Sequence, residues 1–113
     1  MFAFIKGTLI ESTPTSVIIE TGGIGYRIYI PADLHGRLPQ AGCALLLHTS
    51  FIVRELSQTL YGFLSTQERD LFEALMGVTG IGPKLALSII GHISLGDLQQ
   101  AVLRSDIPSL SKI

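Results

Sequence analysis

The sequence predicts an α+β protein in which a small five-stranded β-barrel, over residues 1–63, precedes a helical unit over residues 64–113. Three observations support this division. Short β-rich apolar runs, separated by glycine and proline, fill the first part. After residue 63 the spacing of the apolar residues becomes helical. In the second part, a glycine-rich stretch over residues 79–82 separates two helical segments, as a tight turn does.

Five short strands are expected in the first part. Gly22 and Gly23 form a two-residue hairpin signal between the second and third strands, Pro31 ends the third, and residues 33–38 form a short turn or helix. The expected strands cover residues 2–10, with a bulge at Lys6 and Gly7, and residues 17–19, 24–30, 45–53 and 59–63. Short antiparallel strands in a closed apolar set predict a Greek-key barrel of the oligonucleotide-binding (OB) type.

Helix signals begin directly after the last strand. Ser65 and Glu68 have the spacing of a capping box. Apolar residues then follow at helical spacing: Leu71, Phe72, Leu75 and Met76. Further helices are expected over residues 94–102 and 106–110. The sequence ends at Ile113 as a second hairpin unit begins, so we expect it to be part of a longer protein.

The glycine-rich turn is the strongest candidate site. It consists of Thr79, Gly80, Ile81 and Gly82. Pro83 suits the first position of the next helix, where its missing N–H has no cost. The free N–H groups of the helix N-terminus would then face outward past very small side chains, and Lys84 adds a positive charge. Such a site fits a nucleic-acid phosphate and reads no base.

The glycines have two other interpretations. Glycine turns also join helices in many proteins that bind nothing. A nucleotide-binding P-loop does not fit, because Pro83 stands where that motif needs its lysine, and no serine or threonine follows Lys84. The apolar pattern after the turn favours instead a helix-hairpin-helix motif, which contacts the DNA backbone without sequence preference.

Composition narrows the class of protein. Hydrophobic residues make up 47% of the 113 residues, charged residues 15%, and the mean hydropathy is +0.48. No apolar run reaches the length of a membrane-spanning helix, so self-association or a partner surface is expected. A net charge of −1 argues against coating DNA by bulk electrostatics. Cys43 is the only cysteine, which suits a reducing cytosol, and the N-terminus lacks the pattern of a signal peptide.

No catalytic, metal or cofactor site is expected. His35, His48 and His92 have no metal-ligand spacing, and no nucleophile stands beside a base in any recognisable pattern. Aromatic side chains of the strands could stack on bases, although such positions are more often core. They are Tyr26, Tyr29, Phe51, Tyr61 and Phe63.

Several motifs together resemble the RuvA family, the Holliday-junction-binding subunits of the bacterial RuvAB branch-migration complex. They are FIVRE at 51–55, LYGF at 60–63, QERDLF at 67–72, GIGPKLAL at 80–87 and GGIGY at 22–26. The resemblance implies an OB-fold barrel that helps to build a homotetramer, and two helix-hairpin-helix units that bind the four arms of a junction. It implies a non-catalytic cytoplasmic protein of recombination, DNA repair and the SOS response. A third domain would engage the ATP-driven motor RuvB, and the resolvase RuvC would act with the full-length protein.

The resemblance also assigns roles to residues. DNA would contact Thr79, Gly80, Ile81, Gly82 and Lys84, with Arg54 beside a phosphate. Glu55 would form an acidic pin at the junction centre, where its carboxylate repels phosphates and guides strands apart. The family usually has two adjacent acids, whereas Leu56 follows here. From the residues alone, a solvated hairpin charge is the more common interpretation of Glu55, and Arg54 could simply pair with it.

Two other functions stay open at this point. A single-strand binder using the barrel face would prefer single strands to junctions. A purely structural oligomerisation module would have no affinity for DNA.

Overall fold

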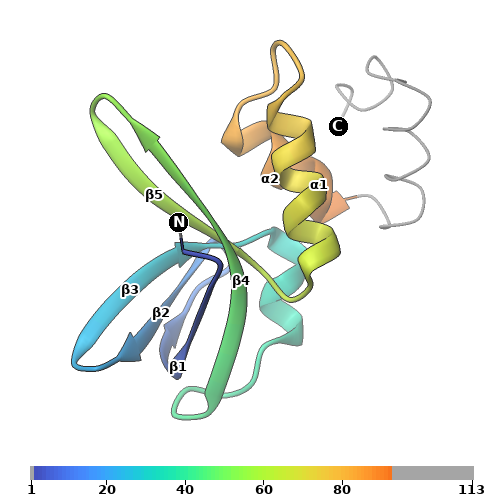
Figure 1. Ribbon diagram of the computed structural model, residues 1–113. Coiled ribbons are helices and arrows are strands. Elements are labelled where there is room, and N and C mark those ends of the chain that lie inside the picture. Colours follow the sequence, from blue (N-terminus) through green and yellow to red (C-terminus); the bar gives the residue numbers. More distant parts are fainter. Residues whose placement is uncertain (1, 93–113) are drawn as a thin grey trace.

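A closed five-stranded barrel with two helices beside it forms the computed structural model, which describes residues 2–92 (Figure 1). The strands are β1 (Phe4–Ser12), β2 (Ser16–Thr21), β3 (Ile24–Tyr29), β4 (Ala44–Arg54) and β5 (Ser57–Phe63). A 3-10 helix η1 (Ala32–Arg37) follows β3, and helices α1 (Thr66–Met76) and α2 (Pro83–His92) follow β5. The predicted α+β fold with an OB-type barrel is confirmed. The expected helices beyond residue 93 lie outside the described residues.

The order of the strands around the barrel is β1-β2-β3-β5-β4. Four of the five seams are antiparallel, but β3 and β5 pair in parallel, with Ile28 opposite Leu60 and Tyr29 opposite Tyr61. The expectation of antiparallel strands is wrong at this seam. The reason is geometric: strand direction alternates across each antiparallel seam, so a closed ring with an odd number of strands must contain a parallel pair.

The β2–β3 hairpin follows the local sequence signal. Gly22 and Gly23 have positive φ angles of 60° and 82°, a combination that two-residue hairpin turns require and that glycine adopts without strain. Thr21 pairs with Ile24 directly across this turn.

The predicted bulge at Lys6 and Gly7 is wrong. Both residues pair in regular register with β4, and the irregularity of β1 lies between Leu9 and Glu11. Gly7 has a different role, because a Cβ at this position would collide with the backbone carbonyl of Glu20 on β2. The glycine therefore permits a close approach of two strands.

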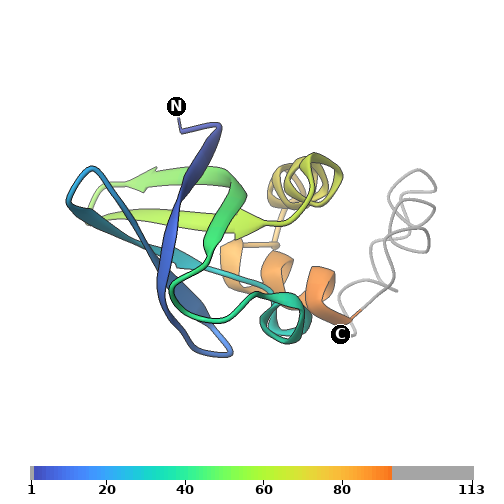
Figure 2. The ribbon, with the colours of Figure 1, turned by 90° about the horizontal axis from the view of Figure 1, so that it is seen from below.

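Two apolar cores stabilise the fold. The first fills the barrel and includes Leu34 of η1 at 0% exposure. The second lies between β5 and the two helices, where Phe72 of α1 packs against Tyr61 and Phe63 with ring centroids 5.1 Å apart in each pair. Figure 2 shows both helices beside one end of the barrel. Because β5 contributes side chains to this second core, the helices are packed onto the barrel.

Helix α1 begins at the predicted capping box. The hydroxyl of Ser65 accepts a hydrogen bond from the Glu68 N–H at 3.2 Å and donates one to the Glu68 carboxylate at 3.0 Å. Arg37 of η1 also lies 3.6 Å from that carboxylate. The buried face of α1 then follows the predicted spacing, with Phe72 and Leu75 fully buried.

Candidate nucleic-acid interface

The turn between α1 and α2 is anchored on its inner side. Ile81 is 6% exposed, belongs to the second core, and donates its N–H to the Val78 carbonyl at 3.1 Å. Neither the side chain nor the N–H of Ile81 is therefore free for a ligand, although the sequence placed this residue at the contact. Its role in the structure is to fix the turn, so that the neighbouring exposed residues keep one geometry.

The outer side of the turn is formed by glycine. Gly80 has a φ of 89°, a conformation that other residues rarely adopt. Gly80 and Gly82 are both exposed, and no atom lies within 4 Å of a Cβ built on either. Thr79 is exposed beside them. A ligand can therefore approach the backbone here without meeting side chains.

Helix α2 starts at this open surface. The carbonyl of Gly82 accepts the first helical hydrogen bond, from the Ala86 N–H at 3.0 Å, and Pro83 is the first residue of the helix. The first N–H groups of any helix lack partners within it, and its N-terminus carries a partial positive charge. Lys84 is exposed in this first turn and adds a full charge. The geometry is that of an anion site.

The predicted Arg54 and Glu55 lie on a separate hairpin. Arg54 pairs with Ser57, and Glu55 and Leu56 form the two-residue turn between β4 and β5. Leu56 is 96% exposed, and both charged residues are also exposed. In Figure 1 this hairpin and the α1–α2 turn both extend toward the upper edge of the molecule.

Arg54 does not pair with Glu55. The ion pairs among residues 2–92 join Arg37 to Asp33 and Glu68, and Arg69 to Asp70. The charge of Arg54 acts on Tyr61 instead. Burial raises the pKa of the Tyr61 hydroxyl, the neighbouring Tyr29 adds to this, and the Arg54 guanidinium opposes it. Tyr61 therefore stays protonated at neutral pH and can donate a hydrogen bond.

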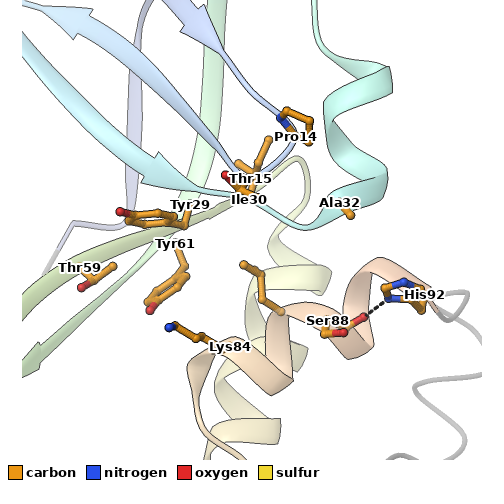
Figure 3. Close-up of a pocket in the computed structure, with 11 residues that line it drawn as sticks. Pro14, Thr15, Tyr29, Ile30, Ala32, Thr59, Tyr61, Lys84, Ser88 and His92 are labelled. Atoms are coloured by element: carbon orange, nitrogen blue, oxygen red, sulfur yellow. Dashed lines mark hydrogen bonds between the residues drawn. The ribbon is translucent and has the colours of Figure 1, made fainter. Parts of the chain in front are cut away.

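A pocket of about 560 Å³, which the sequence did not predict, lies between the barrel and α2 (Figure 3). Tyr29, Thr59 and Tyr61 line its barrel side, and Lys84 and Ser88 line its helix side. The prediction that the strand aromatics are core holds for Tyr61 and Phe63, but Tyr29 is 39% exposed. No local signal could have found this pocket, because its two walls are far apart in the sequence.

One of the three histidines has a defined hydrogen-bond partner. A ring nitrogen of His92 donates to the Ser88 carbonyl at 2.7 Å, near the end of α2. His35 and His48 are half-buried. Within residues 2–92, no three His, Cys, Asp or Glu side chains are grouped closely enough for a metal ion. The helices of this described part are all too short or too polar to cross a membrane.

The fold defines a small OB-type barrel protein with a helical unit attached behind its last strand. The chain belongs to the RuvA family, since the protein-family model described as RuvA N terminal domain matches residues 1–62.

Proteins of several bacteria are similar over the whole chain. It is 54% identical over 113 residues to a protein of Protochlamydia amoebophila, with 100% of this chain and 56% of the relative covered. It is 49% identical over 113 residues to a protein of Opitutus terrae, with 99% of this chain and 56% of the relative covered. It is 42% identical over 113 residues to a protein of Escherichia coli O1:K1 / APEC, with 100% of this chain and 56% of the relative covered. Each of these relatives is named Holliday junction branch migration complex subunit RuvA. The chain spans about half of their length.

Proposed function

We propose that this chain is the N-terminal part of a non-catalytic subunit that binds four-way DNA junctions by shape and backbone contacts. Residues 1–63 would be the OB-fold domain, and residues 64–113 an incomplete helix-hairpin-helix domain. The observation that carries the proposal is the exposed glycine surface at Gly80 and Gly82 in front of the N-terminus of α2. A phosphate at this surface would meet backbone N–H groups and the Lys84 ammonium.

The nearly neutral net charge of the protein is consistent with phosphate contacts made mainly by backbone N–H groups. With eight Lys and Arg against nine Asp and Glu, the chain lacks the excess of positive charge that bulk DNA binding requires. Affinity must then come from a few well-placed groups. Backbone N–H groups are such donors, because their number does not depend on net charge. Thr79, Gly80, Gly82 and Lys84 would form the phosphate contact.

The β4–β5 hairpin would act on the junction in a second way. Arg54 would contact a phosphate, whereas the exposed Glu55 would repel phosphates at the crossover and guide the strands apart. Two facts support this division of roles: both side chains are exposed, and no ion pair joins them.

Assembly into a homotetramer would place several such surfaces around one junction. Exposed apolar side chains on the outside of the barrel support self-association, among them Phe4 at 55%, Ile10 at 52% and Ile24 at 55% exposure. In the full-length protein, the tetramer would direct the ATP-driven motor RuvB in branch migration and act with RuvC. It would do so in the cytoplasm during recombination, repair and the SOS response.

A gel-shift comparison tests the proposal. The chain is titrated against a four-way junction, a duplex and a single strand of matched sequence at 50 mM and 200 mM salt. We expect the junction to bind most tightly, with an affinity that falls as salt rises. Preference for the single strand would favour a single-strand binder, and no affinity for any of the three would favour an oligomerisation module. Either result would refute the proposal.

A further inference from the structure

The pocket between the barrel and α2 has two chemically different walls. On the barrel side, Tyr29 presents a ring that is 39% exposed, with its centroid 6.1 Å from that of Tyr61 and the two planes tilted by 42°. Tyr61 is in turn packed against Phe72 at 5.1 Å. Tyr29 thus stands at the edge of a supported aromatic stack, where a flat ring could lie against it.

The opposite wall is cationic and polar. Lys84 extends from α2 toward the Tyr61 hydroxyl, and Ser88 and His92 follow along the same helix (Figure 3). None of the described residues that line the pocket is an aspartate or a glutamate. The pocket therefore favours a ligand with an aromatic ring and a negative charge.

Size and position narrow the class of ligand. A volume of about 560 Å³ lies in the range of small-molecule sites and accommodates a base with its sugar and phosphate. Lys84 belongs both to this pocket and to the first turn of α2, where the proposed phosphate surface lies. A strand whose backbone passes over that surface would bring its next nucleotide to the mouth of the pocket.

We propose that this pocket binds one unstacked nucleotide of a DNA strand, with the base against Tyr29 and its phosphate near Lys84. The hydroxyl groups of Thr59 and Tyr61 would meet the edge of the base or the sugar. Stacking on an aromatic side chain tolerates any base, so the pocket would recognise an unpaired nucleotide and not a sequence. This inference rests on the proposed function, and it adds a contact that duplex DNA cannot make.

Photocrosslinking tests the base contact directly. In a series of four-way junctions, 5-iodouracil replaces one thymine at a time, either in an arm or at the crossover. Each junction is irradiated in complex with the complete chain, and the crosslinked peptides are then mapped. We expect Tyr29 to crosslink to iodouracil near the crossover and not to positions within the arms. Crosslinks that avoid Tyr29 at every position would overturn the proposal.

Affinity measurements separate stacking from other effects. Tyr29→Ala should weaken binding of a single-stranded oligonucleotide about tenfold and leave duplex binding unchanged, since only the unpaired base uses this wall. Tyr29→Phe should restore binding, because the ring remains. Gln58→Ala, which trims an exposed strand side chain that does not line the pocket, is the control and should behave as the wild type. Equal single-strand affinity of Tyr29→Ala and wild type would refute the nucleotide pocket.

Two further outcomes identify other occupants. If Tyr29→Ala lowers the sedimentation coefficient of the free protein, a second copy of the chain occupies the pocket, and the proposal fails. If deoxythymidine monophosphate binds as tightly as the oligonucleotide, the pocket takes a free nucleotide, and its role in strand binding fails. A wild-type chain that binds junctions while Tyr29→Ala changes nothing would refute this inference alone. Absence of junction binding by the wild type would refute the proposed function.

Discussion

Replacing Gly82 by valine tests whether DNA approaches the backbone at the start of α2. In the folded chain a Cβ at this position meets no atom within 4 Å, and the residue does not have a positive φ. The fold should therefore accept Gly82→Val with a loss of stability of about 1 kcal/mol or less, the size expected when an N-terminal cap is changed. The added side chain would occupy the space that a phosphate needs.

The expected loss of affinity is larger than the loss of stability. A hydrogen bond from a backbone N–H to a charged group contributes about 1.5–3 kcal/mol, so losing one such bond should weaken binding roughly 10- to 150-fold. Fluorescence anisotropy with a labelled junction measures the Kd, and circular dichroism measures the thermal midpoint of the same samples. Both are needed, because an unfolded variant would also lose affinity.

One further glycine variant serves as a control, and a second tests the conformation of the turn. Gly36→Val adds the same side chain at another exposed glycine with open space around it, away from the turn, and should keep the wild-type Kd. Gly80→Ala places a Cβ at a φ of 89° and should lower stability by about 1–3 kcal/mol. If Gly82→Val folds and binds the junction as tightly as Gly36→Val does, the backbone contact at the turn does not exist.

Other predictions concern charge, protonation and assembly. Lys84→Ala should weaken binding equally for all sequences and lower the slope of log Kd against log salt by about one; a changed sequence preference would contradict a pure phosphate contact. Glu55→Gln should strengthen junction binding about twofold at low salt, because two unit charges roughly 8 Å apart in water, the carboxylate and a phosphate, repel each other by about 0.5 kcal/mol. The gain should vanish at high salt, which screens this repulsion. A clear loss of affinity at low salt would exclude the repulsive pin. Because folding raises the pKa of Tyr61 above its ordinary value of 10.0, its contribution to stability is complete below pH 10 and declines at higher pH. Urea titrations between pH 9 and 11.5 should accordingly show a smaller decline for Tyr61→Phe. Light scattering at high micromolar concentration should detect tetramers, and a strict monomer would contradict self-association of this chain.

Features that depend on a few neighbouring residues could be predicted from the sequence. The Gly22 and Gly23 hairpin and the Ser65 cap of α1 are of this kind, since each is determined by backbone conformation or by one hydrogen bond within a few residues. The change from strands to helices was equally clear, because burial on one face imposes a period that the apolar residues follow.

Features that depend on distant strands could not be predicted in this way. A glycine in a strand suggests either a bulge or a close approach of two backbones. Gly7 permits a close approach, and this is evident only from the position of the Glu20 carbonyl on β2. Ile81 is similar: its apolar side chain fits both an exposed turn and a core, and its burial follows from how α1 and α2 pack on β5. The pocket could not be predicted either, because its barrel wall and its helix wall come from distant parts of the sequence.

The aromatic core behind β5 connects these observations to function. Tyr61 and Phe63 belong to the barrel, yet they pack on Phe72 of α1. Ile81 joins the same core from the turn. The glycine surface is thereby fixed relative to β5, the strand that also carries one side of the Glu55 hairpin. A loosened core should therefore impair junction binding even when every proposed contact residue is present. Phe72→Leu should lower the thermal midpoint and reduce junction affinity more than affinity for one duplex arm, because a duplex needs only one of these surfaces at a time. Equal losses for junction and duplex would show that the two surfaces act independently.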